Sequence, residues 1–138
     1  PLLVRAQAEA GAELVLIPSC TEFVSGYRRV RTAARARALE NQIATVQSPT
    51  VGEALWSPAV DQNAGAAGVF VPPDAKLSMT GTLAEGQLNE PGWVSAEIDF
   101  SALRELRNSG EMRNAADWAL QPGAQPLAQE VEVVDLTS

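Results

Sequence analysis

The chemistry open to this chain is limited first by the residue types it lacks. Its 138 residues include no histidine and a single cysteine, Cys20. A Ser-His-Asp triad, a Cys-His dyad and a histidine metal site each need an imidazole, so this chain alone cannot build them. A single cysteine also excludes an internal disulfide and a cysteine-rich metal cage. We therefore expect no metal and no cofactor.

Cys20 is nevertheless well placed to meet a ligand. Residues 14–17 (LVLI) form a continuously apolar run too short for a helix, which predicts a strand buried on both faces, as in parallel sheets. Ligands gather at the carboxyl ends of such strands, and Cys20 follows this one. No residue is an obvious base for its thiol, so a pocket-wall, a packing and a nucleophilic role stay open. Glu22 is either a solvated acid at a helix start or an acid that contacts substrate.

Helices and strands alternate in the first third of the chain. Residues 2–10 and residues 25–41 carry helical patterns, and Thr21 or Ser25 is the candidate cap of the longer helix. Residues 43–46 form a second short apolar run. This order implies right-handed crossovers between parallel strands, and hence an α/β fold.

The later part of the chain does not continue this alternation. The expected elements are strands at residues 68–71, 77–83 and 93–98, a helix at 102–108 capped by Ser101, and a last edge strand through Val131, Val133 and Val134. Apolar and polar residues alternate through 93–98, so that strand is expected to be half exposed. From Ser109 onward the chain is rich in turns and acidic residues.

Charge is spread unevenly along the chain. Residues 1–41 carry six arginines against four acids, and residues 42–138 carry four basic residues against thirteen acids. The net charge of −7 argues against general nucleic-acid binding. Arg28, Arg31 and Arg35 line one face of the expected helix at 25–41, where like charges at this spacing repel. We expect acidic groups to compensate them, from later in the chain or from a second copy.

No apolar run approaches the roughly 20 residues that span a membrane, and no signal peptide is recognised. A cytoplasmic location is therefore the default expectation. The chain begins at Pro1 without an initiator methionine, which suggests a piece of a longer protein.

Five stretches, in this order and spacing, resemble the nitrilase, or carbon–nitrogen hydrolase, superfamily. They are residues 12–19 (AELVLIPS), 35–41 (RARALEN), 68–71 (GVFV), 92–99 (GWVSAEID) and 103–104 (LR). The resemblance covers about residues 1–108. It implies an α/β fold that is part of a four-layer α-β-β-α sandwich (nitrilase-like), lacking its N-terminal half.

Members of that superfamily hydrolyse amides, nitriles, carbamoyl groups or related C–N bonds with a cysteine thiolate, helped by a lysine and a glutamate. Pro1 matches the proline of the family's nucleophile segment, so the resemblance places this Glu-Lys-Cys triad upstream of the chain and no catalytic residue within it. It implies the C-terminal portion of a cysteine-dependent hydrolase of non-peptide C–N bonds, inactive by itself.

The resemblance also implies which residues line the substrate pocket. They are Ser19, Cys20, Thr21, Glu22, Tyr27 and Arg28. Tyr27 and Arg28, with Arg31, are candidates for binding a substrate carboxylate, as arginines in this region do in some carbamoyl-amino-acid hydrolases. A structural or dimer-interface role is the alternative for these three.

The partners implied are a small amide or nitrile substrate, the missing N-terminal half of the domain, and a second copy docked through the alanine-rich helix at 25–41. Residues 1–110 would be the C-terminal half of the hydrolase domain, and residues 111–138 a tail or arm. Two other functions stay open: a non-catalytic dimerising interaction module with the same sandwich fold, and an unrelated small α/β binding domain.

Overall fold

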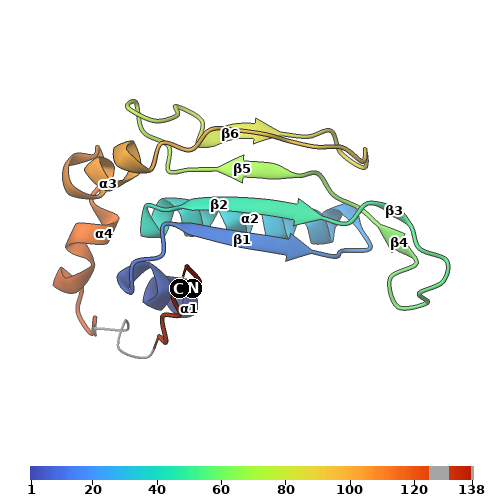
Figure 1. Cartoon of the computed structure of the whole chain (residues 1–138), viewed down its shortest axis with the longest axis horizontal. Helices are drawn as coiled ribbons and strands as arrows, with labels where there is room; N and C mark the ends of the chain where they lie inside the picture. Colours follow the sequence, from blue (N-terminus) through green and yellow to red (C-terminus); the bar gives the residue numbers. More distant parts are fainter. Residues whose placement is uncertain (125–130, 138) are drawn as a thin grey trace.

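The structure, a computed structural model, describes residues 1–124 and 131–137 and is a mixed α/β fold (Figure 1). Its helices are α1 (Leu2–Glu9), α2 (Val24–Asn41), α3 (Phe100–Ser109), α4 (Asn114–Asp117) and the 3-10 turn η1 (Trp118–Leu120). Its strands are β1 (Leu14–Ser19), β2 (Ala44–Pro49), β3 (Gly52–Glu53), β4 (Gln62–Asn63), β5 (Gly68–Phe70) and β6 (Thr82–Glu85).

The main sheet has the strand order β1-β2-β5-β6. β1 and β2 are parallel, with α2 as the crossover between them, which confirms the α/β arrangement expected for the first third of the chain. β5 pairs antiparallel to β2, and β6 pairs antiparallel to β5. β3 and β4 form a separate two-stranded arm that projects from the body beyond the carboxyl ends of β1 and β2 (Figure 1).

One face of the main sheet is covered by α2. Ala34, Ala38 and Phe70 form a buried cluster there, with Ile17 packed against it. The hydroxyl of Thr45 donates to the carbonyl of Ala34 at 3.1 Å, which fixes β2 against the helix. These buried alanines therefore serve the close approach of helix and sheet within the chain.

The opposite face of the sheet is only partly covered. A second cluster of Ala44, Val71 and Leu103 lies near the amino end of β2, where α3 packs. On the same face, Leu14 is 37% exposed and Leu16 is 69% exposed. The prediction that the first strand is buried on both faces is therefore wrong. Exposure alternates along β1, because residues 131–134 lie across an open hollow of about 510 Å³ from these leucines and do not bury them as α3 buries the start of β2.

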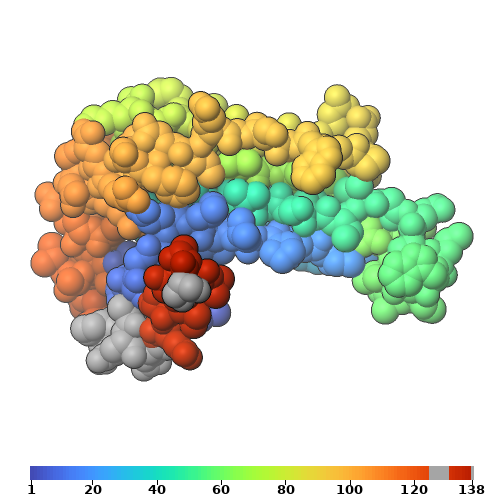
Figure 2. Space-filling view, in the orientation of Figure 1, coloured from blue at the N-terminus to red at the C-terminus, as the bar shows by residue number. Residues whose placement is uncertain are grey.

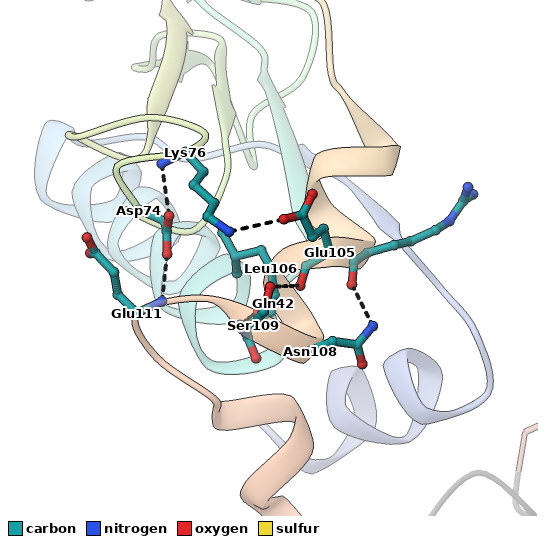
Figure 3. Close-up of polar contacts among 9 residues, drawn as sticks. Gln42, Asp74, Lys76, Glu105, Leu106, Asn108, Ser109 and Glu111 are labelled. Carbon is teal, nitrogen blue, oxygen red and sulfur yellow. Dashed lines mark hydrogen bonds and ion pairs between the residues drawn. The ribbon is translucent and has the colours of Figure 1, made fainter.

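Buried polar groups join the helices to the amino-terminal end of the sheet (Figure 3). Gln42 ends α2 in the left-handed conformation, with φ of 50°, and is 1% exposed. Its Nε2 donates to the carbonyls of Leu106 and Met112, at 3.1 and 2.9 Å, and its Oε1 accepts from the backbone N–H of Ala115 at 2.8 Å. One side chain thus ties α2 to α3 and α4.

Asp74 forms a second set of buried hydrogen bonds at the same end of the molecule (Figure 3). Its two carboxylate oxygens accept from the backbone N–H groups of Lys76, at 2.9 Å, and Glu111, at 3.0 Å. These two hydrogen bonds hold the pKa of the Asp74 carboxyl below its usual value, against the opposing effect of burial.

Several local predictions differ from the structure. The strand expected at 77–83 lies at Thr82–Glu85, and the helix expected from residue 102 begins at Phe100 with Asp99, not Ser101, as its cap. α2 begins at Val24 without a side-chain cap. Residues 131–134 form no strand.

Residues 93–98 also form no strand, contrary to the sequence prediction. The segment runs beside β6, with Val94 near Gly86, but its backbone makes no hydrogen bond to the described residues (Figure 1). The residues alternate as in a strand, but a strand also needs a neighbouring strand with which its backbone can form hydrogen bonds.

Within the described residues, no helix is long and apolar enough to cross a membrane.

Candidate functional site

The carboxyl ends of β1 and β2 lie at the same edge of the sheet because the two strands are parallel. β1 ends at Ser19, and the segment from Cys20 to Phe23 then leads into α2. The backbone N–H of Thr50, just after β2, donates to the carbonyl of Ser19 at 2.9 Å. The fold thus brings the first four predicted pocket residues to one edge, next to the base of the β3–β4 arm.

Cys20 belongs to a small polar cluster at this edge. Its Sγ donates to Oδ1 of Asn63 at 2.9 Å, and the hydroxyl of Thr50 donates to the same oxygen at 2.7 Å. The Asn63 amide is oriented in turn by its own donation to the carbonyl of Val60 at 2.8 Å. A carboxamide oxygen accepts a hydrogen bond but is not a general base, so Asn63 does not activate Cys20 as a nucleophile.

Thr21 fastens the neighbouring segment to the same edge. Its hydroxyl donates to the carbonyl of Ala64 at 2.9 Å, and the N–H of Ala64 donates to the carbonyl of Thr21 at 2.8 Å. A Cβ at Gly26 would lie 3.0 Å from Cβ of Thr21, so glycine permits this close passage of the α2 start. The hydroxyl of Ser19 is buried without a partner among the described residues.

Tyr27 and Arg31 lie one to two turns into α2 and meet β6. The Glu85 carboxylate accepts from Nε and Nη2 of Arg31, the latter at 2.7 Å, and from the Tyr27 hydroxyl at 3.2 Å. The hydrogen bonds from Arg31 lower the pKa of Glu85 below its usual value. Burial, followed by the charge of Glu85, raises the pKa of Tyr27.

The expectation that acidic groups compensate the α2 arginines is therefore confirmed for Arg31. Arg35 instead donates to the carbonyl of Thr80 at 2.9 Å. The Arg28 side chain is exposed and has no hydrogen bond or ion pair with the described residues.

Two grooves flank the start of α2. The first, which we call the acidic groove, has a volume of about 450 Å³ and borders the polar cluster of Cys20. It is lined by Glu22, Phe23, Val24, Gly52, Glu53, Gln62, Asn63, Ala64 and Asn89. The second, of about 410 Å³, is lined by Tyr27, Arg28, Arg31, Thr32, Ala66, Glu85, Gly86 and Leu88. A larger hollow of about 510 Å³ lies away from this edge, between β1 and residues 131–134.

The six predicted pocket residues thus fall into two neighbouring places. Ser19, Cys20, Thr21 and Glu22 lie at the strand ends, and Tyr27 and Arg28 line the second groove. Sequence reasoning missed Thr50, Asn63, Glu53 and Glu85. Polar residues after the second strand were a usable signal for Thr50, whereas Asn63 reaches Cys20 only through the path of the β3–β4 arm. Within the described residues, no group of cysteines and carboxylates is arranged to hold a metal ion.

No protein-family model matches the chain. A curated protein named "Probable hydrolase YhcX", from Bacillus subtilis (strain 168), is 38% identical to it over 117 residues. The match covers 85% of this chain and 23% of that protein, so the chain spans about a quarter of the relative's length. The chain is therefore similar to one part of a longer protein that is named a probable hydrolase.

Proposed function

We propose that the chain is the C-terminal portion of a cysteine-dependent hydrolase that acts on an amide, nitrile or carbamoyl C–N bond. The observation that carries the proposal is the similarity to part of a longer probable hydrolase, together with the ordered nitrilase-like stretches. The exposed edge that holds Cys20, Thr21 and Glu22 provides walls for a substrate. The hydrogen-bond partner of Cys20 at this edge is the amide oxygen of Asn63, which is not a base.

In this proposal the triad lies upstream of Pro1 in the longer protein. A cysteine thiolate attacks the carbon of the C–N bond, a glutamate moves protons, and a lysine stabilises the developing negative charge. Water then hydrolyses the thioester or thioimidate. This chain contributes the pocket wall at Ser19, Cys20, Thr21 and Glu22, and the side groove at Tyr27 and Arg28.

The same proposal assigns a partner to the uncovered sheet face. The preceding half of the domain would pack over Leu14 and Leu16 and complete a four-layer α-β-β-α sandwich, of which residues 1–110 are the second half and residues 111–138 a tail. A second copy would dock on α2. The protein would be cytoplasmic and would need no cofactor.

The experiment compares this chain with a longer polypeptide that carries the upstream segment. The chain alone should show no turnover of amides or nitriles, and the longer protein should turn over and lose activity when its upstream cysteine becomes alanine. Cys20→Ala in the longer protein should stay within about tenfold of the parent. Turnover by the chain alone, with mass spectrometry locating the acyl group on Cys20, would refute the assignment.

A non-catalytic dimerising interaction module with the same sandwich fold is the second candidate, and the upstream sequence separates it from the hydrolase. A longer polypeptide that lacks the upstream cysteine, lysine and glutamate, yet forms a stable dimer by light scattering, would replace the hydrolase assignment with this one.

A further inference from the structure

One buried side chain between α2 and the main sheet has no hydrogen-bond partner. Gln47 lies towards the end of β2 and is 1% exposed. Both polar atoms of its amide, Oε1 and Nε2, are buried without a partner among the described residues. Gln42 is equally buried, but its amide makes three hydrogen bonds. A buried amide that has lost its water and gained no partner costs free energy, so Gln47 requires a ligand that the described side chains do not supply.

The register of the strands shows on which face this side chain lies. Thr45 and Gln47 are two residues apart on β2, so they share one face of the sheet. The hydroxyl of Thr45 donates to the carbonyl of Ala34 in α2, so this is the face that α2 covers (Figure 1). On β1, Ile17 is the direct neighbour of Gln47 and packs on the buried Phe70 cluster. The Gln47 amide therefore lies on an apolar face beneath the helix.

A second buried polar group without a partner lies on the same face. Ser19 follows Ile17 by two residues along β1, so its side chain also faces α2. Its hydroxyl oxygen is buried and has no hydrogen bond to the described residues. Ser19 is diagonal to Gln47 across the two parallel strands, and ordinary strand spacing puts their Cα atoms roughly 8 Å apart. Long side chains reach such diagonal neighbours, so the Gln47 amide can share one bridging molecule with the Ser19 hydroxyl.

Water has the chemistry that all three atoms require. The amide offers one acceptor atom and one donor atom, and the hydroxyl offers both functions, as water does. Internal waters typically make about three hydrogen bonds to buried polar groups that lack other partners, which is the number of such atoms on this face of β1 and β2. Neither residue lines any of the grooves and hollows described above. We infer that Ser19 and Gln47 bind an internal water molecule, enclosed between α2 and the sheet.

Such a water ties the end of β1 to β2 immediately before the candidate site. Ser19 is the last residue of β1, and its carbonyl accepts from the backbone N–H of Thr50 at 2.9 Å. With the water on its hydroxyl, Ser19 is held by both its backbone and its side chain at the point where the chain leaves the sheet towards Cys20. A contribution of Ser19 to a pocket wall then comes from its backbone. The inference does not depend on the proposed hydrolase function.

A high-resolution crystal structure of the 138-residue chain tests the inference directly. Electron density for one water should lie within hydrogen-bond distance of both the Ser19 hydroxyl and the Gln47 amide. A direct hydrogen bond between the two side chains, an amide turned to a backbone partner, or a dry contact would each overturn it. This measurement needs no variant and no substrate, so its outcome is independent of any activity.

Denaturant unfolding of variants tests the same bridge in solution. Gln47→Met keeps the length of the side chain and removes both polar atoms, and Ser19→Ala removes the hydroxyl. Each should raise the unfolding equilibrium constant by about two- to tenfold, because a satisfied buried group is lost and its partner is left with one hydrogen bond fewer. Ser48→Ala is the matched control, since Ser48 is the exposed serine that follows Gln47 on β2. It should change the constant by less than about twofold.

The double variant separates a shared water from two independent sites. If one water joins the two side chains, the combined effect of Gln47→Met and Ser19→Ala should fall short of the product of the single effects by at least about twofold. Independent, multiplicative effects would overturn the bridge. A Gln47→Met variant more stable than the parent would also overturn it, because methionine relieves the cost of a buried amide only where that amide is dry and unpaired.

Discussion

The two ends of the main sheet differ in how far their polar side chains are buried. At the amino-terminal end, Gln42 and Asp74 are almost fully buried, and their hydrogen bonds hold α3 and α4 in place. At the carboxyl end, Cys20 and the groove glutamates are exposed, and the β3–β4 arm stands away from the body (Figure 2). The comparison teaches that the buried polar contacts between elements and the candidate functional site lie at opposite ends of the sheet.

The largest loss of stability is expected at the amino-terminal end of the main sheet, from the substitution Gln42→Ala. The substitution removes three hydrogen bonds and leaves the Met112 carbonyl and the Ala115 N–H without this partner, while the Leu106 carbonyl keeps the Gly110 N–H. Buried groups left unpaired cost about 1–3 kcal/mol each, and such losses are not additive, so we expect about 3 kcal/mol in the free energy of unfolding. Denaturant unfolding measures it.

Gln121→Ala is the matched control, since Gln121 is exposed and its side chain makes no hydrogen bond to the described residues. It should change the free energy of unfolding by less than about 0.5 kcal/mol. Equal effects of the two substitutions would mean that the amino-terminal end is not the stabilising one.

Asp74→Asn should cost somewhat less, about 2 kcal/mol near neutral pH, because the amide keeps one acceptor oxygen but turns a donor toward a backbone N–H. The effect depends on pH with a definite sign. The folded pKa of Asp74 is lowered, so its stabilisation is complete above the unfolded value of about 3.9 and is lost as the pH falls through the folded value.

Unfolding curves at pH 7, 4 and 3 therefore test Asp74 directly. The difference between the parent and Asp74→Asn should shrink toward the lowest pH. Asp61→Asn, at an exposed aspartate of the arm, is measured alongside as the control. A gap that stays constant with pH would show that the charge of Asp74 is not what stabilises this end.

A smaller effect is expected midway along the molecule, from Glu85→Gln. The ion pair with Arg31 is partly exposed, with side-chain exposures of 26% and 29%, and such pairs contribute below about 1 kcal/mol. The second readout is Tyr27, the only tyrosine of the chain. Its pKa should fall toward the ordinary value when the negative charge is removed, although burial still keeps it raised.

Ultraviolet absorbance during an alkaline titration follows the Tyr27 phenol alone. An unchanged Tyr27 pKa in Glu85→Gln would contradict the hydrogen-bonded arrangement of α2 and β6. The same titration of Glu97→Gln serves as the control, since Glu97 is exposed and is not among the groups that shift the Tyr27 pKa.

Local sequence patterns predicted the fold well where an element depends on its own residues. The apolar run at residues 14–17, the long helix and the following strand all form close to their expected bounds. The patterns failed where structure depends on a neighbour. Residues 93–98 alternate between apolar and polar as a strand does, yet they form no strand because no neighbouring strand pairs with them. Leu16 is apolar, as a core residue would be, but its side chain is exposed.

The candidate site was predictable to a similar degree. Residues that follow a strand could be placed at its carboxyl end, and Cys20, Thr21 and Glu22 lie there. The partners that define their environment come from loops, and loop paths are set by tertiary contacts rather than by periodicity. Asn63 is brought to Cys20 by the return of the β3–β4 arm, and Glu85 to Tyr27 by the antiparallel order of the last two strands.

The smallest change is expected on the uncovered face, from Leu16→Ser. Because Leu16 is already 69% exposed, its replacement forfeits little buried apolar area and should change the free energy of unfolding by less than about 0.5 kcal/mol. Ile17→Ser is the paired control. Ile17, the next residue along β1, packs on the Phe70 cluster under α2, so its replacement should lower the free energy of unfolding by about 2 kcal/mol. Comparable losses for both would mean that the face is covered in solution. Light scattering would then show whether a second copy covers it.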